Sequence, residues 1–214
     1  MRQRITTTKR KEIQQDYDEK FLGGGYENPV SFVQFVLDTI RRNTDSRTPQ
    51  KLLDVACGNG NFLALAEQSY HTYGVDISKE AIMQARRRAT RTNLSVGTAE
   101  RIRFPNKFFD IVTCLGSLEH FVDMNASLRE MKRVLKPAGL AIIHVPNSRY
   151  LVHRLLGIET HGQIIERFAT KSEWTALLEP FFTVKKTYKY NTRWYLSWIP
   201  LSSCCHFTFV CKNP

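Results

Sequence analysis

The sequence predicts an α/β domain with a doubly wound, mostly parallel sheet that ends in an antiparallel hairpin strand. Between Lys51 and Val145, short apolar segments of strand length alternate with amphipathic segments of helix length. Such alternation is typical of parallel strands joined by right-handed crossovers. Two later segments alternate polar and apolar residues, as strands with one buried face do. The length of 214 residues, with 42% hydrophobic and 24% charged residues, suits one folded domain.

The first 30 residues are expected to form a flexible arm or lid in front of a single domain over residues 31–214. They are polar and basic, and then glycine-rich at Gly23–Gly25. The domain is predicted to open with an amphipathic helix over Ser31–Arg42. Its apolar residues follow helical spacing: Phe32, Val33, Phe35, Val36, Leu37 and Ile40.

The alternating region contains the predicted parallel strands and their crossover helices. The strands are Lys51–Ala56, Thr72–Asp76, Leu94–Gly97, Phe109–Leu115 and Leu140–Val145. The helices are Asn61–Gln68, Ser78–Thr90 and Met124–Leu135. Ser78 is expected to cap its helix, and Lys136–Gly139, which contains proline and glycine, is expected to stop the last one.

The C-terminal region adds a helix and two strands. Lys171–Leu178 is predicted to be helical, with Thr170 or Ser172 as its cap. Phe182–Tyr190 and His206–Lys212 are rich in aromatic and β-branched residues and should pair antiparallel. With these two, the predicted sheet has seven strands.

Charge and cysteine content limit the partners and the compartment. The formal net charge of +11 favours anionic partners, but the basic clusters are short and scattered, so nucleic acid is disfavoured without being excluded. No apolar stretch is long enough for a membrane span, and peripheral membrane contact stays open. Five cysteines without a CxxC pair, behind an N-terminus that does not resemble a signal peptide, indicate reduced thiols and a cytoplasmic protein.

The most informative segment is the turn after the first predicted strand. Leu52 to Phe62 reads as a buried strand, a turn containing Gly58 and Gly60, and a helix start that presents free N–H groups. Asp76 follows Gly58 by eighteen residues, at the end of the next strand, where its carboxylate can accept hydrogen bonds from both ribose hydroxyls. An ordinary turn with Asp76 as a helix cap is the simpler interpretation, but the combined spacing favours a nucleoside site.

A nicotinamide dinucleotide is the main rival ligand. Its binding motif requires a third glycine three residues after the second, and that position is Leu63 here. An acid directly before the turn, Asp54, would also suit a cationic amino-acid group better than a pyrophosphate.

The motifs as a set resemble the class I S-adenosylmethionine-dependent methyltransferases, in the small-molecule branch that includes ubiquinone and menaquinone biosynthesis enzymes. They are Asp54–Gly60, Gly74–Asp76, Val96–Glu100 with Phe104–Pro105, Phe109–Val112, Ser117–His120 and Arg129–Gly139. The resemblance is strong over Lys51–Asn147 and implies a Rossmann-like fold with S-adenosylmethionine as cofactor and S-adenosylhomocysteine as product. Two positions depart from the family pattern: Ala56 replaces the first glycine, and Thr98 replaces an aspartate that contacts the adenine.

The resemblance also implies the residues that bind the cofactor. They are Asp54, Ala56, Cys57, Gly58, Asn59, Gly60, Asp76, Ile77, Thr98, Ala99, Glu100 and Leu115, with Tyr17 and Tyr26 from the arm that folds over the cofactor in relatives. No metal is expected, because Gly116 stands where quinone methyltransferases that hold a metal have a further acid.

The motifs specify the acceptor less well than the cofactor. The segment after the fourth strand, Thr113–Gly116, lacks the pattern of enzymes that methylate base amines, and no cysteine follows a proline as in covalent C5 methylation. We therefore expect O- or C-methylation of a small, partly apolar molecule. It should bind between an insert at about residues 146–170 and the aromatic tail Tyr188–Trp198, although these aromatics could instead cover the sheet.

His120 is the candidate general base, because it follows the fourth strand and imidazole titrates near neutrality. An equally weighted alternative is that His120 only hydrogen-bonds a loop carbonyl. His144, within a buried strand, is expected to be a hydrogen-bonded residue of the core or of its rim. Two other functions stay open for the chain as a whole: an RNA-modifying methyltransferase, favoured by the charge, and a cofactor-binding module without catalysis.

Overall fold

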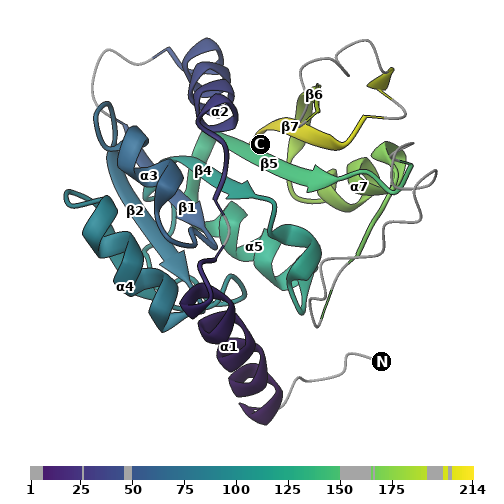
Figure 1. Ribbon diagram of the computed structural model, residues 1–214. Helices are drawn as coiled ribbons and strands as arrows, with labels where there is room; N and C mark the ends of the chain where they lie inside the picture. The colour runs from purple at the N-terminus through teal and green to yellow at the C-terminus, as the bar shows by residue number, and fades with distance from the viewer. Residues whose placement is uncertain are drawn as a thin grey trace.

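The computed structural model of the chain describes residues 7–25, 27–45, 50–149, 165, 167–191, 200–201 and 204–214. Seven strands of these residues form one sheet in the order β3-β2-β1-β4-β5-β7-β6 (Figure 1). The strands are β1 Lys51–Val55, β2 His71–Asp76, β3 Asn93–Val96, β4 Phe109–Leu115, β5 Leu135–Pro146, β6 Thr183–Tyr190 and β7 His206–Lys212. β1 to β5 pair in parallel, and β7 pairs antiparallel with both β5 and β6. The predicted doubly wound sheet with a C-terminal hairpin is confirmed.

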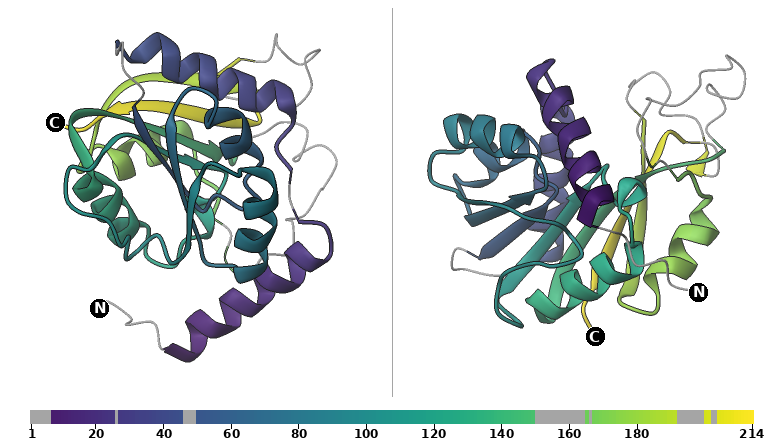
Figure 2. Two further views of the ribbon diagram at one scale, coloured as in Figure 1. Left: turned by 90° about the vertical axis from the view of Figure 1, so that its left-hand side faces the viewer. Right: turned by 90° about the horizontal axis from the view of Figure 1, so that it is seen from below.

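Helices cover both faces of this sheet, as Figure 2 shows. One face packs against α2 Val30–Asn43, α3 Asn61–Ala66 and α4 Lys79–Arg88. The other packs against α5 Met124–Val134 and α7 Lys171–Leu178. Because side chains alternate along a strand, neighbouring residues of β1 supply both cores: Leu52 lies in the first and Leu53 in the second. The strand order reverses between β1 and β4, and in open α/β sheets ligands bind at the carboxyl ends of the strands at such a reversal.

Within the expected flexible arm, Thr7–Leu22 form helix α1, which was not predicted from the sequence. Its buried apolar residues are Ile13 and Phe21, and two such residues are too few to form an apolar face along the helix. The position of the helix depends on contacts with the start of α4, which is far away in the sequence. The local pattern of residues in α1 cannot reveal such contacts. Tyr26 lies outside the described residues.

Strand β5 begins five residues earlier than predicted, at Leu135 instead of Leu140. Leu135 pairs with Phe109 across an irregularity in the ladder, so the helix before it ends at Val134. Ala138, in the expected helix stop, has a positive φ of 58° and donates its N–H to the carbonyl of Asn213 at 2.9 Å. The proline-containing segment is therefore the start of a strand and not a separate loop.

The predicted caps are confirmed at two helices. Ser78 accepts a hydrogen bond from the N–H of Ala81 at the start of α4. Thr170, one of two candidates, caps α7 in a capping box with Glu173. Within the part of the chain that the structure describes, no helix combines the length and apolar character needed to cross a bilayer.

Candidate functional site

The turn after β1 is built from residues in the left-handed backbone region. Ala56, Gly58 and Gly60 have φ values of 59°, 53° and 76°. At Gly60 a side chain is excluded on two grounds, since a Cβ atom would also lie 2.9 Å from Cβ of Ala85 in α4. Cys57 anchors the turn to β2 by donating its N–H to the carbonyl of Val75 at 3.1 Å. The turn therefore presents backbone, and not side chains, at the carboxyl edge of the sheet.

Asp76 connects this turn to the next helix. Its Oδ2 accepts the N–H of Gly58 at 2.8 Å, and its Oδ1 accepts the N–H of Ser78 at 2.9 Å. The residue is only 5% exposed. Each carboxylate oxygen has a second lone pair, so both can accept a further hydrogen bond, for example from a hydroxyl group.

Asp54 is a second buried carboxyl group beside the turn, 3% exposed. Its Oδ1 accepts the hydroxyl of Thr113 in β4 at 2.6 Å. Burial raises its pKa from 3.8 to about 7; the Thr113 hydrogen bond opposes this rise, and the charge of Asp76 adds to it. Burial also raises the pKa of Asp76 to about 6, against the lowering effect of the hydrogen bonds from Ser78 and Gly58. Two buried carboxyl groups of this kind would gain stability from a cationic ligand.

The other predicted cofactor residues lie around this centre. Thr98–Glu100 follow β3, whose last residue Val96 pairs with Asp76. The carbonyl of Asp76 accepts the N–H of Gly97 at 2.8 Å, which holds that segment next to the turn. Leu115 ends β4 at the same edge. Asn59 is buried within the turn, and Ile77 follows Asp76 directly.

The loop that continues beyond Glu100 is fixed by Arg133 of α5. Its guanidinium donates to the carbonyls of Ile102 and Phe104 at 2.7 and 2.8 Å, and to Glu130 at 2.8 Å. The N–H of Ile102 in turn donates to Glu130 at 2.9 Å. This network lowers the pKa of Glu130, chiefly through the hydrogen bond from Arg133. Arg133 and Glu130 therefore hold the loop that follows Glu100 in position beside the site.

Helix α1 contacts the glycine turn and the start of α4 through two residues that the sequence did not indicate. Asp18 accepts the Ser78 hydroxyl at 2.6 Å and the N–H of Glu80 at 3.1 Å, so it binds the first turn of α4. The ring of Phe21 packs on the glycine turn, because a Cβ atom on Gly58 would lie 3.3 Å from its Cζ. Figure 2 shows α1 beside α4.

Tyr17, the predicted arm residue that the structure describes, is half-buried on α1. The ammonium of Lys20 lies 5.5 Å from the centroid of its ring. Its role in cofactor binding stays a prediction.

His120 lies in a short 3-10 helix, η1 Leu118–His120, directly after β4. Its Nδ1 lies 2.7 Å from the carbonyl oxygen of Ile165. A carbonyl can only accept, so Nδ1 carries a proton and Nε2 is the basic nitrogen of the neutral ring. Nε2 lies 3.7 Å from Oε1 of the buried Glu119. The hydrogen bond to a loop carbonyl, which was the alternative to a role as general base, is thus present. The same hydrogen bond fixes the tautomer with a basic Nε2, which a general base would need.

His144 of β5 is a hydrogen-bonded core residue, as predicted. Its Nδ1 lies 2.8 Å from the hydroxyl of Thr208, and its ring stacks on that of His206 with centroids 4.8 Å apart. Burial, together with His206, lowers the pKa of His144 well below its usual value. Tyr190 packs on the same group, its ring centroid 5.7 Å from that of His144.

The predicted acceptor region is described only in part. Tyr188 and Tyr190, the first aromatics of the tail, pack against Phe35 of α2 and therefore cover the sheet. Trp194, Tyr195 and Trp198 lie outside the described residues, as does most of the insert.

Comparison with known proteins shows what this chain is similar to. A model of the methyltransferase domain matches residues 53–143. The uncharacterized methyltransferase YcgJ of Bacillus subtilis is 29% identical over 175 residues, which cover 74% of this chain and 67% of YcgJ. The ubiquinone/menaquinone biosynthesis C-methyltransferase of Cupriavidus metallidurans is 36% identical over 105 residues, which are 45% of this chain. That match spans 43% of the relative, so the chain covers less than half of its length.

Among solved structures, the PH0226 protein from Pyrococcus horikoshii has a TM-score of 0.70 at 25% identity, covering 86% of this chain and 90% of that one. The shared fold, the matched domain and the glycine turn with its two acids agree with one another. Residues 53–143 therefore match a methyltransferase domain, and the chain is similar in sequence and fold to S-adenosylmethionine-dependent methyltransferases.

Proposed function

We propose that the chain binds S-adenosylmethionine at the carboxyl edge of β1, β2 and β4 and transfers its methyl group to a small, partly apolar molecule by O- or C-methylation. One observation carries this proposal: a glycine turn in left-handed conformation lies between two buried carboxyl groups, Asp54 and Asp76, within a methyltransferase domain. The quinone-pathway names of several relatives favour a small-molecule acceptor.

The donor set fits this cofactor. Asp76 would accept the two ribose hydroxyls through the lone pairs that Gly58 and Ser78 leave unused. Asp54 would balance the positive charge of the amino-acid end, which favours its ionised form. The lack of a side chain at Gly58 lets the backbone approach the ligand closely. The cofactor supplies an activated methyl group, so these residues need only bind and orient it.

Thr98–Glu100 and Leu115 would line the adenine, held by the loop network of Arg133. Residues 1–30 would act as a lid on a single domain over residues 31–214, and the contacts of Asp18 and Phe21 support this for α1.

His120 would act as general base when the acceptor is a hydroxyl. The hydroxyl proton would pass to Nε2 while the hydroxyl oxygen attacks the methyl carbon and the sulfonium sulfur leaves as a neutral thioether. The hydrogen bond between Nδ1 and Ile165 holds the ring and leaves Nε2 as the acceptor.

Methylation of RNA is a second candidate function, which the net charge of +11 favours. Incubation with methyl-labelled S-adenosylmethionine and separate pools of small phenols, small acids and total RNA distinguishes the two. We expect label in the small-molecule pools. Label in RNA alone would overturn the acceptor class, and label in no pool despite tight cofactor binding would favour a binding module.

A further inference from the structure

Helix α1 is joined to the proposed cofactor site by a chain of hydrogen bonds that runs through Ser78. The hydroxyl of Ser78 donates to Oδ1 of Asp18 in α1 at 2.6 Å. The N–H of Ser78 donates to Oδ1 of Asp76 at 2.9 Å, and Oδ2 of Asp76 accepts the N–H of Gly58 at 2.8 Å. Ser78 is fully buried, so these contacts are shielded from water. One buried residue therefore lies between an acid of α1 and the carboxyl group that is expected to hold the ribose.

The C-terminal end of α1 reaches the glycine turn as well. The ring of Phe21 is buried on Gly58, and the carbonyl of Phe21 accepts the side-chain N–H of Gln84 in α4 at 2.8 Å. Gly25 leaves room for this ring, because its φ is 65° and a Cβ atom there would lie 2.5 Å from Cδ1 of Phe21. The last turn of α1 therefore contacts both the glycine turn and α4.

Polar contacts supply much of the attachment of α1. Its buried apolar side chains are Ile13 and Phe21, so the two hydrogen bonds that Asp18 accepts, from the Ser78 hydroxyl and the N–H of Glu80, are a large share of what holds it. A segment with few buried apolar contacts can open locally at low free-energy cost. The docking of α1 is therefore sensitive to a single side chain.

The charge of Asp18 also acts on Asp76. Burial raises the pKa of Asp76 to about 6, backbone hydrogen bonds oppose this rise, and the charge of Asp18 adds to it. The other titratable groups that face Asp76 are Asp54 of β1 and Cys57 of the turn. The start of α4 faces it with a backbone N–H, and β3 pairs with it through Val96, which carries no charge. Among the described residues, no cation forms an ion pair with Asp18 or Asp76. The charge state of Asp76 therefore depends on whether α1 is docked.

We propose that Asp18 is a positioning residue for the cofactor site: through Ser78 it couples the docking of α1 to the orientation and charge of Asp76, so that S-adenosylmethionine binds more tightly when α1 is docked. Coupling between two binding events is reciprocal, so the bound cofactor in turn holds α1 on α4. A helix that only covers the site would not have this effect on Asp76. The inference rests on the proposed binding of S-adenosylmethionine.

Calorimetric titration of S-adenosylmethionine into Asp18→Ala and Asp18→Asn tests this coupling. Alanine removes the acceptor of the Ser78 hydroxyl but favours the helix, so it should weaken binding by roughly five- to twentyfold without unfolding α1 itself. Asparagine keeps an acceptor oxygen without the charge, so it should restore most of the affinity. In Asp18→Asn the pH below which the affinity falls should be lower than in the wild type, because the charge that adds to the rise in the pKa of Asp76 is gone. Asp54 is unchanged in these proteins and contributes equally to their pH profiles.

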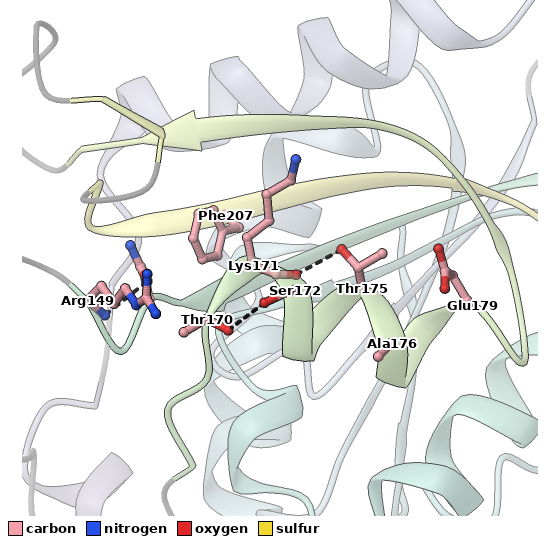
Figure 3. Close-up of a pocket in the computed structure, with 9 residues that line it drawn as sticks. Arg149, Thr170, Lys171, Ser172, Thr175, Ala176, Glu179 and Phe207 are labelled. Atoms are coloured by element: carbon pink, nitrogen blue, oxygen red, sulfur yellow. Dashed lines mark hydrogen bonds between the residues drawn. The ribbon is translucent and has the colours of Figure 1, made fainter.

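Hydrogen exchange measures the coupling in the other direction. Saturating S-adenosylmethionine should slow exchange in residues 7–22 of the wild type, and this slowing should be lost in Asp18→Ala while the core strands stay protected. Two controls that each remove one negative charge should leave the affinity and the pH profile unchanged. Asp16→Asn changes an acid of α1 that pairs with Lys20 at 2.7 Å. Glu179→Gln changes an exposed acid at the end of α7, on the other face of the sheet (Figure 3).

Unchanged affinity in Asp18→Ala, an unchanged pH profile in Asp18→Asn, or equal weakening by either control would overturn the proposal and leave Asp18 as a contact that only holds the helix. Exchange in residues 7–22 that is the same with and without the cofactor in the wild type would also count against it. Failure of the wild type to bind S-adenosylmethionine would instead count against the proposed function.

Discussion

Replacing Asp54 by asparagine should make the protein more stable at pH 8 and not at pH 4. Burial raises the pKa of Asp54 from 3.8 to about 7, so the folded state holds a proton that the unfolded state has lost between these pH values. The stability contributed by this proton is complete below pH 4 and is lost as the pH rises through 7. Asparagine keeps the acceptor for the hydroxyl of Thr113, at 2.6 Å in the wild type, and carries no charge.

The expected size follows from the shift. A rise from 3.8 to about 7 corresponds to about 4 kcal/mol at pH 8, at 1.36 kcal/mol for each pKa unit. A protein of this size gains about 2–4 °C in Tm for each kcal/mol, so the variant should unfold roughly 8–16 °C above the wild type at pH 8. Near pH 4 the two proteins should unfold at the same temperature.

Thermal unfolding followed by circular dichroism from pH 4 to pH 8 measures this difference. Asp45→Asn, at an exposed aspartate after α2, is the matched control and should give parallel curves at all pH values. A variant at Asp54 that is less stable than the wild type at pH 8 would refute the reasoning, because it would mean that the ionised carboxylate is stabilised by its surroundings. The same variant should bind S-adenosylmethionine about 1.5–3 kcal/mol more weakly if Asp54 faces its cationic end.

Three further substitutions test the turn, the base and the lid. Gly60→Ala should cost more stability than Gly116→Ala in urea unfolding, by about 1–3 kcal/mol, because both have positive φ but a Cβ atom meets Ala85 only at Gly60; equal losses would show that backbone strain alone decides. His120→Ala should lower kcat for a hydroxyl acceptor by about 10²–10⁴ and remove the acidic limb of the pH–rate profile, with cofactor affinity unchanged; full turnover would leave it as a loop brace. Asp18→Asn should increase hydrogen exchange in residues 7–22 without changing the core strands; unchanged exchange there would mean that α1 is held by other contacts.

The elements that local pattern determines could be predicted from the sequence. Phe109–Leu115 and His206–Lys212 have the bounds expected from their apolar and alternating residues. Gly58 and Gly60 were identified because a positive φ at a strand-to-helix turn selects glycine. Ser78 was identified because a hydroxyl before a helix start is a common cap.

The features that the sequence could not predict depend on contacts between distant residues. Asp18 and Ser78 are separated by 60 residues, and no local property of α1 indicates that it packs there. The packing of Phe21 on Gly58 is equally non-local. For Asp76, the spacing predicted a hydroxyl-binding acid, and the structure adds that it also fixes Gly58 by a hydrogen bond. The roles of these residues toward the cofactor stay predictions.

Calorimetric titration of S-adenosylmethionine into the wild type and Asp76→Ala tests the central claim most directly. We predict saturable binding to the wild type that weakens by about 1.5–3 kcal/mol in the variant, and no tight binding of NADH. Asp110→Ala is the matched control, because this acid pairs with Lys136 at 2.7 Å at the amino end of the sheet, and its affinity should equal that of the wild type. Unchanged affinity in a folded Asp76→Ala protein, or tight binding of NADH, would contradict the account.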